Sequence, residues 1–212
     1  MIKYAYQTVR FILYPVIFLA DALQNNFTNF FTPMNIGPVA KPEYSHFIKK
    51  KIQKNDYVLD FGCGAGFFCN LFSKKKYLGV EINTNFVKTA KKKYKKYNFK
   101  ILNKNCLNGY RNKITVVFIN NVIHHLSNEQ IDDMFIFFKK KLKPKTKFFI
   151  IEPEFPRFFF SLQFFMHALD IGNNIMTKNE YLKILKKFLL IKNCKVKKLG
   201  IAHGVYVNGL LK

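Results

Sequence analysis

The chain reads VLDFGCGAGFF over residues 58–68. A short apolar run ends at Asp60, glycine then occupies every second position, and apolar residues resume at Phe67. This pattern predicts a buried strand over residues 57–61 that turns sharply into a helix over residues 67–72. Glycine suits such a turn because it adopts positive φ readily and lets a ligand lie directly against the main chain.

The spacing of the glycines also indicates which ligands do not fit. A dinucleotide-binding fingerprint has its third glycine three residues after the second, where this chain has Phe67. No Gly-Lys-Ser/Thr sequence follows the glycines, so a phosphate-binding P-loop is not indicated. Neither of the two common phosphate-binding turns is therefore predicted here.

The stretch from Asp60 to Gly66 resembles the nucleotide-binding motif of class I S-adenosylmethionine (SAM) dependent methyltransferases of the small-molecule type. SAM offers a carboxylate to the helix start and carries no phosphate. The resemblance covers residues 43–212 and implies a Rossmann-like, doubly wound α/β fold. Its seven-stranded sheet would be mostly parallel and end in an antiparallel hairpin. A glycine turn that binds nothing is the alternative. The turn residues implied to contact the methionine portion of SAM are Asp60, Gly62, Cys63, Gly64 and Gly66.

Residues 77–81 predict the second strand, which ends at Glu81, one strand–helix–strand repeat after Asp60. An acid at this place can accept both ribose hydroxyls, although a solvated acid at a strand end is the alternative. Ile82 would pack on the adenine, and Asn105 and Cys106 would border it after a third strand over residues 99–102. Cys106 could equally be a small apolar core residue.

A fourth strand over residues 114–120 runs into Asn120 and the sequence VIHHL. The resemblance implies that Asn120 and His124 lie near the reacting methyl group. His124 or His125 could act as a general base, because imidazole titrates near neutral pH. Alternatively, one histidine packs beneath the cofactor and the other caps the next helix. Glu152 ends a fifth strand over residues 148–151, where it would either touch the acceptor or be solvated.

Three amphipathic or capped segments predict helices over residues 86–97, 131–142 and 180–190. Ser127 and Thr177 are each followed three residues later by Gln or Glu, which is typical of a capping box. Two late strands over residues 195–199 and 205–211 must be antiparallel, because a parallel pair needs a much longer crossover.

The segments outside this repeat are expected to form a helical cap and linker over residues 1–42 and an aromatic insertion at about residues 155–176. Residues 11–20 are almost wholly apolar but too few to span a bilayer. A helix packed over the substrate cleft, an interfacial membrane helix and a signal peptide remain open. The aromatic insertion favours an apolar, aromatic or lipid-like acceptor.

The 212 residues carry a formal net charge of +24, which would favour an anionic partner such as nucleic acid or a membrane surface. Only three of the 36 basic residues are arginine, the side chain best suited to phosphate and base recognition. No Asn-Pro-Pro-aromatic or Pro-Cys sequence marks a base-methylating enzyme. An RNA methyltransferase and a non-catalytic SAM-binding or membrane-surface scaffold therefore remain as alternatives.

The four cysteines form no Cys-x-x-Cys pair, and the histidines show no metal-ligand spacing, so no metal site is expected. Scattered single cysteines suit a reducing cytoplasm, with membrane association left open. The sequence thus predicts a cytoplasmic enzyme that uses SAM to methylate an O, N or C atom of a small acceptor.

Overall fold

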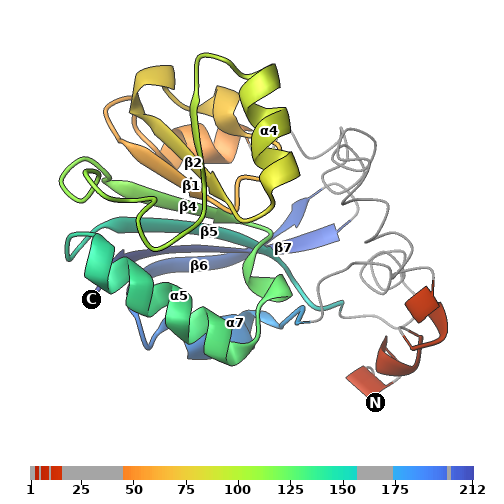
Figure 1. Cartoon of the computed structure of the whole chain (residues 1–212). Helices are drawn as coiled ribbons and strands as arrows, with labels where there is room; N and C mark the ends of the chain where they lie inside the picture. Colours follow the sequence, from red (N-terminus) through yellow and green to blue (C-terminus); the bar gives the residue numbers. More distant parts are fainter. Residues whose placement is uncertain (1–2, 5, 10, 16–44, 157–173, 200–201) are drawn as a thin grey trace.

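A seven-stranded sheet forms the centre of the computed structural model, which describes residues 3–4, 6–9, 11–15, 45–156, 174–199 and 202–212 (Figure 1). The strand order is β3-β2-β1-β4-β5-β7-β6. The strands are β1 (Val58–Phe61), β2 (Tyr77–Glu81), β3 (Asn98–Ile101), β4 (Val116–Asn120), β5 (Lys147–Pro153), β6 (Leu189–Leu199) and β7 (Ala202–Leu211).

Strands β1 to β5 are parallel to one another, and β7 runs antiparallel to both β5 and β6. The order reverses between β1 and β4, and such a switch point is where ligands bind in open α/β sheets. The predicted doubly wound sheet and its antiparallel hairpin are confirmed.

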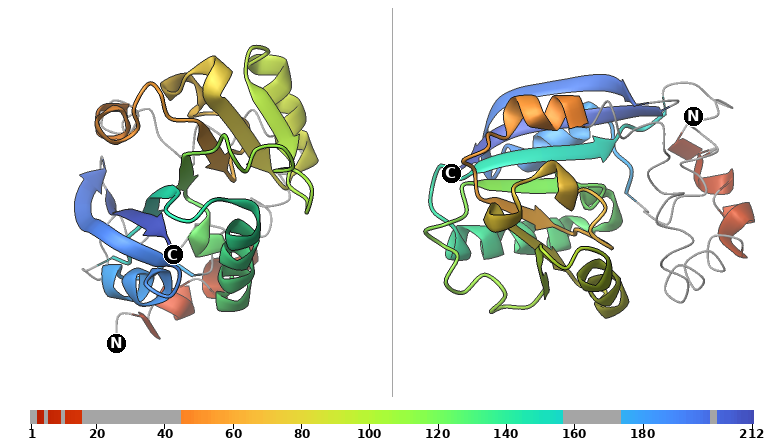
Figure 2. Two further views of the ribbon diagram at one scale, coloured as in Figure 1. Left: turned by 90° about the vertical axis from the view of Figure 1, so that its left-hand side faces the viewer. Right: turned by 90° about the horizontal axis from the view of Figure 1, so that it is seen from above.

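Helices cover both faces of the sheet (Figures 1 and 2). They are α4 (Thr84–Lys93), α5 (Asn128–Lys141) and α7 (Lys178–Leu185), together with helical residues 45–51. Side chains alternate along each strand, so Val117 and Ile119 of β4 join the core under α5 and α7. Val116 and Phe118 point the other way, into the core shared with α4 and residues 45–51.

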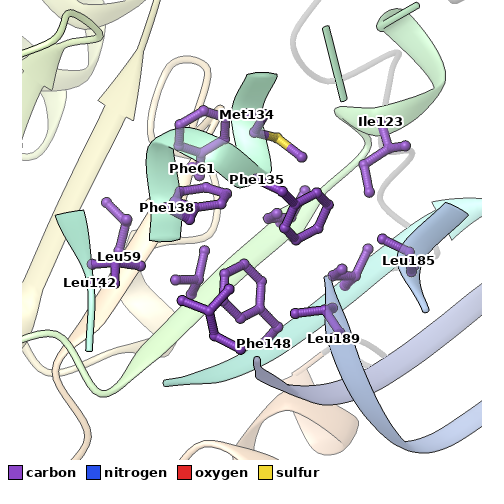
Figure 3. Packing of buried hydrophobic residues seen from close by; sticks show 14 of the residues in the cluster. Leu59, Phe61, Ile123, Met134, Phe135, Phe138, Leu142, Phe148, Leu185 and Leu189 are labelled. Carbon is purple, nitrogen blue, oxygen red and sulfur yellow. The ribbon is translucent and has the colours of Figure 1, made fainter. Parts of the chain in front are cut away.

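The core under α5 and α7 is rich in aromatic rings (Figure 3). Phe135 of α5 stacks on Phe188 with ring centroids 4.8 Å apart, and Phe138 meets Phe61 of β1 edge to face. Close aromatic packing of this kind fixes α5 against the carboxyl half of β1. The loop that leads from β4 into α5 is thereby held next to the glycine turn.

Two predicted helices differ in the structure. Residues 67–72 hold only a 3₁₀ turn, η1 (Cys69–Leu71), because the short connection from β1 to the adjacent β2 is largely used by the glycine turn and by η2 (Lys74–Lys76). The helix predicted over residues 180–190 ends at Leu185, since Leu189 and Leu190 already pair with β7. Strand β6 accordingly begins well before residue 195.

Both predicted capping boxes are present. The Ser127 hydroxyl accepts the backbone N–H of Gln130 and caps α5, so neither His124 nor His125 supplies this cap. Thr177 and Glu180 cap α7 in the same way. These local bonds satisfy backbone N–H groups that have no partner within the helix.

The N-terminal residues are helical wherever the structure describes them between residues 3 and 15. Tyr6 is buried against Phe155, with ring centroids 5.1 Å apart, and both belong to a small apolar cluster with Ile175. The predicted linker over residues 16–42 and the insertion residues 157–173 lie outside the described part of the chain.

Candidate active site

The glycine turn joins β1 to η1 through three left-handed residues, Gly62, Gly64 and Gly66, whose φ angles are 73°, 51° and 80°. A Cβ at Gly62 would lie 2.4 Å from Cγ2 of Val122, and one at Gly66 would lie 2.8 Å from Cζ of Phe99. Gly62 and Gly66 therefore permit close packing. At Gly64 a Cβ would meet no atom within 4 Å, so the open side of the turn lies there.

Glu81 fastens this turn to the end of β2. Its Oε2 accepts the N–H of Gly64 at 2.9 Å, and its Oε1 accepts the N–H of Asn83 at 2.9 Å. An ionised carboxylate offers about four lone-pair positions, so two acceptor positions remain for further donors such as hydroxyls. The side chain of Ile82 beside it is 73% exposed, which leaves an apolar surface at the same strand end.

Asp60, the last acid before the turn, is buried. Burial raises the pKa of its carboxyl to about 7, the hydrogen bond from Tyr77 lowers it, and the nearby Glu81 charge raises it. Cys63 is also buried, and burial together with the Asp60 and Glu81 charges raises the pKa of its thiol well above the usual range. The thiol is therefore a packing group and a poor nucleophile.

The residues near the predicted adenine position differ in exposure. Asn105 is exposed, and its Oδ1 accepts a hydrogen bond from Nδ2 of Asn108 at 3.4 Å. Cys106 is buried in the core next to Leu107. The Asn105 amide is therefore accessible to a ligand, whereas Cys106 is a core residue.

Asn120 ends β4 with a buried side chain whose Oδ1 has no hydrogen-bond partner among the residues that the structure describes. The next residue, Asn121, takes a left-handed conformation with φ of 55° and turns the chain sharply. A buried amide oxygen without a donor is costly, because its water is removed and not replaced. This oxygen is therefore suited to accept a donor from a bound ligand.

His124 and Glu152 form a buried pair at the ends of β4 and β5. Nδ1 of His124 lies 2.7 Å from Oε2 of Glu152, and both side chains are fully enclosed. Glu152 also accepts the backbone N–H groups of Val122, Ile123 and His124, at 2.9, 2.8 and 3.3 Å. The prediction that Glu152 is solvated is wrong, because the side chain is buried and holds the loop that contains η3 (Ile123–His125).

His125 is exposed, and its ring lies 4.0 Å from that of His124, centroid to centroid. The two histidines of the sequence therefore differ in surroundings: His124 is fixed and enclosed, whereas His125 faces outward.

Three residues that sequence reasoning did not single out complete the site. Tyr77 donates to Asp60, Val122 packs against Gly62, and Asn174 donates its N–H to the carbonyl of His124 at 2.9 Å. Nδ2 of Asn174 also donates to the carbonyl of Leu126. Of these three residues, only Tyr77 could have been identified from the sequence, because a phenol in a buried strand needs a hydrogen-bond partner.

Within the described residues, no group of three or more His, Cys, Asp or Glu side chains could hold a metal ion. The residues at the carboxyl ends of β1, β2 and β4 do fit SAM. They provide an open side at Gly64, remaining acceptor positions on Glu81, an exposed apolar surface at Ile82 and the unpaired Oδ1 of Asn120.

Comparisons with known proteins agree with this geometry. Residues 58–145 match a family described as a methyltransferase domain. No curated protein matches the chain in sequence. A SAM-dependent methyltransferase from Methanosarcina mazei aligns with a TM-score of 0.61 and 18% identity, covering 78% of this chain and 97% of that one.

Two further solved structures share the fold. A SAM-dependent methyltransferase from Aquifex aeolicus aligns with a TM-score of 0.59 and 19% identity over 86% of this chain and all of its own. Geranyl diphosphate C-methyltransferase from Streptomyces coelicolor A3(2) aligns with a TM-score of 0.61 and 13% identity, covering 81% of each chain. At these identities the likeness shows the fold.

The matched domain and the fold together define a class I, Rossmann-like methyltransferase domain. The matched domain supports an enzyme that transfers a methyl group, with SAM as its cofactor.

Proposed function

We propose that this enzyme methylates a small apolar or aromatic acceptor, with His124 as the general base. The observation that carries the proposal is the enclosed His124–Glu152 pair beside the glycine turn. Val122 connects the two, because its side chain packs against Gly62 while its N–H is held by Glu152. His124 lies two residues further along the same loop.

The hydrogen bonds of Glu152 indicate how His124 is oriented. A carboxylate that accepts three backbone N–H groups is an acceptor toward the imidazole as well, so Nδ1 carries the proton. In this tautomer Nε2 is the basic nitrogen of the ring, and an imidazole of this kind takes a proton from a hydroxyl, amine or acidic carbon. When bound, SAM supplies an electrophilic methyl group to the acceptor atom.

The apolar character of the acceptor is supported by the residues that follow β5. Phe155 and Ile175 are buried with Tyr6 at the sheet edge where β5 ends. They flank the insertion predicted to form the acceptor pocket. Two of the similar structures are named as methyltransferases of geranyl diphosphate, a prenyl compound, which makes prenyl compounds sensible first acceptors to test.

The proposal is tested by separating SAM binding from methyl transfer. SAM binding is measured by calorimetry, and transfer is measured with methyl-labelled SAM against a panel of prenyl diphosphates, prenyl alcohols, phenols and unmodified RNA. We expect saturable SAM binding and transfer to a prenyl or phenolic acceptor. SAM binding with no transfer to any of them would overturn the acceptor class, and transfer to RNA alone would replace it.

The role of His124 is tested by His124→Gln. We expect kcat to fall by roughly 10²- to 10⁴-fold, as is typical when a general base is lost, while the Kd for SAM stays near that of the wild type. His46→Gln is the matched control, since His46 is exposed on helical residues 45–51, which pack on the opposite face of the sheet from α5. An unchanged kcat in His124→Gln would remove the base from the mechanism.

A further inference from the structure

The described N-terminal helical residues, 3–4, 6–9 and 11–15, have two opposite apolar faces. The inner face consists of Tyr6, Val9 and Leu13, which pack against Phe155 and Ile175. At the start of the helix, Nζ of Lys3 donates to Oε1 of Glu180 in the first turn of α7 and also lies 5.6 Å from the ring centroid of Phe155. These contacts fix one side of the helix to the domain.

The outer face is defined by Tyr4, Phe11, Ile12 and Tyr14, which are 80%, 82%, 69% and 63% exposed. At about 100° per residue, Tyr4 and Phe11 point away from the side that carries Tyr6, Val9 and Leu13, and Ile12 and Tyr14 flank them. Three aromatic rings and an isoleucine are thus presented together to solvent. Exposed apolar patches of this kind mark binding surfaces.

The charge of the chain indicates which partner suits this face. With a formal net charge of +24, two copies of the chain repel each other, so self-association through this face is disfavoured. Anionic lipid headgroups attract the same charge, and tyrosine and phenylalanine favour the boundary between headgroups and acyl chains. The exposed Lys183 on α7 adds positive charge near the helix.

The position of the helix connects this face to the site. Figures 1 and 2 show the N-terminal helical residues beyond the carboxyl end of β5, the edge at which Glu152 lies. Phe155, which packs against Tyr6, follows Glu152 by three residues. A surface that binds the outer face is therefore next to the edge that holds the site. Within the described residues, no helix is long and apolar enough to cross a bilayer.

We propose that the outer face docks on an anionic bilayer surface, and that the acceptor reaches the site from that bilayer. The evidence for the docking is the exposed outer face of the helix and the positive charge of the chain, and it does not depend on the proposed function. The route of the acceptor rests on the proposed function, because only an apolar acceptor would dissolve in the membrane.

The test uses the full chain and vesicles of phosphatidylcholine, alone or mixed with phosphatidylglycerol, in a flotation assay. We expect binding to the anionic vesicles that weakens with added salt. The double variant Phe11→Gln, Ile12→Gln should weaken binding by at least about tenfold, since two apolar side chains that would enter the bilayer are lost. Glutamine preserves helix propensity. The control is Ile136→Gln, Leu190→Gln, which removes two exposed apolar residues elsewhere and should bind within twofold of wild type.

Three results would overturn the docking: no binding to anionic vesicles, an equal loss in both double variants, or a dimer in the absence of lipid that the Phe11→Gln, Ile12→Gln variant abolishes. SAM binding is measured on every variant. Loss of vesicle binding with full transfer to a soluble acceptor would contradict this inference and leave the proposed function intact. Vesicle binding without transfer to any acceptor would contradict the proposed function and leave the docking intact.

Discussion

The phenolic hydroxyl of Tyr77 donates a hydrogen bond to Oδ2 of Asp60, with 2.7 Å between the two oxygens. Both side chains are buried at the base of the glycine turn, and the same hydroxyl would lie 2.9 Å from a Cβ at Gly79. Burial raises the pKa of Asp60 to about 7 despite this bond. The acid of the motif is thus poised between its two protonation states near neutral pH.

The first prediction concerns the pH dependence of stability. The folded pKa of Asp60, about 7, exceeds the value of about 4 for an unfolded aspartate, so the folded state keeps a proton that the unfolded state loses. Stability therefore falls as pH rises from about 4 to about 7, by on the order of a few kcal/mol, and then levels off. Urea unfolding of wild type and Asp60→Asn across this range measures it. A difference between the two proteins that does not change with pH would contradict the prediction.

A second prediction separates the contribution of Tyr77. Tyr77→Phe removes the donor that lowers the pKa of Asp60, so the pH at which the stability curve levels off should move upward. The variant should also lose about 1–3 kcal/mol above that pH, because the buried carboxylate lacks its partner. In an Asp60→Asn background the same substitution should leave no shift in the curve, which serves as the control.

The third prediction distinguishes two glycines of the turn. Gly66→Ala places a methyl group 2.8 Å from the Phe99 ring, so we expect about 1–3 kcal/mol of lost stability from overpacking, added to about 1 kcal/mol for its left-handed φ. Gly64→Ala should cost only the φ contribution, because its methyl group points into open space. That methyl group should instead weaken SAM binding. Denaturant unfolding and calorimetric SAM titration of both variants test this contrast, which would fail if Gly64→Ala bound SAM as wild type does.

The fourth prediction treats Glu152 as a positioning residue. Glu152→Gln replaces one acceptor oxygen by an NH₂ group that faces backbone N–H groups or Nδ1 of His124, so both stability and kcat should fall. Because Glu152 acts through His124, the double variant with His124→Gln should lose little more kcat than His124→Gln alone. Additive losses in a double-mutant cycle would show that Glu152 acts on its own.

The central strands, the capping boxes and the hairpin could be predicted because each depends on residues close together in the chain. Apolar runs ending in Asp60, Glu81 and Asn120 marked the strand ends, and Ser127 and Thr177 marked the helix starts. The prediction of a helix after the glycines was wrong, because the short length of chain between β1 and β2 leaves room only for a 3₁₀ turn, whatever the local apolar pattern.

The sequence by itself therefore determined the class of fold and the edge of the sheet where the site lies, since strand periodicity, turn chemistry and caps are local properties. Only the tertiary structure decided that Tyr77 meets Asp60, that Phe99 fills the space at Gly66 and that Glu152 is enclosed with His124. The physical reason is that burial and hydrogen bonding between distant segments set the charge state and orientation of these groups. A local sequence pattern does not specify which distant side chain will make these contacts.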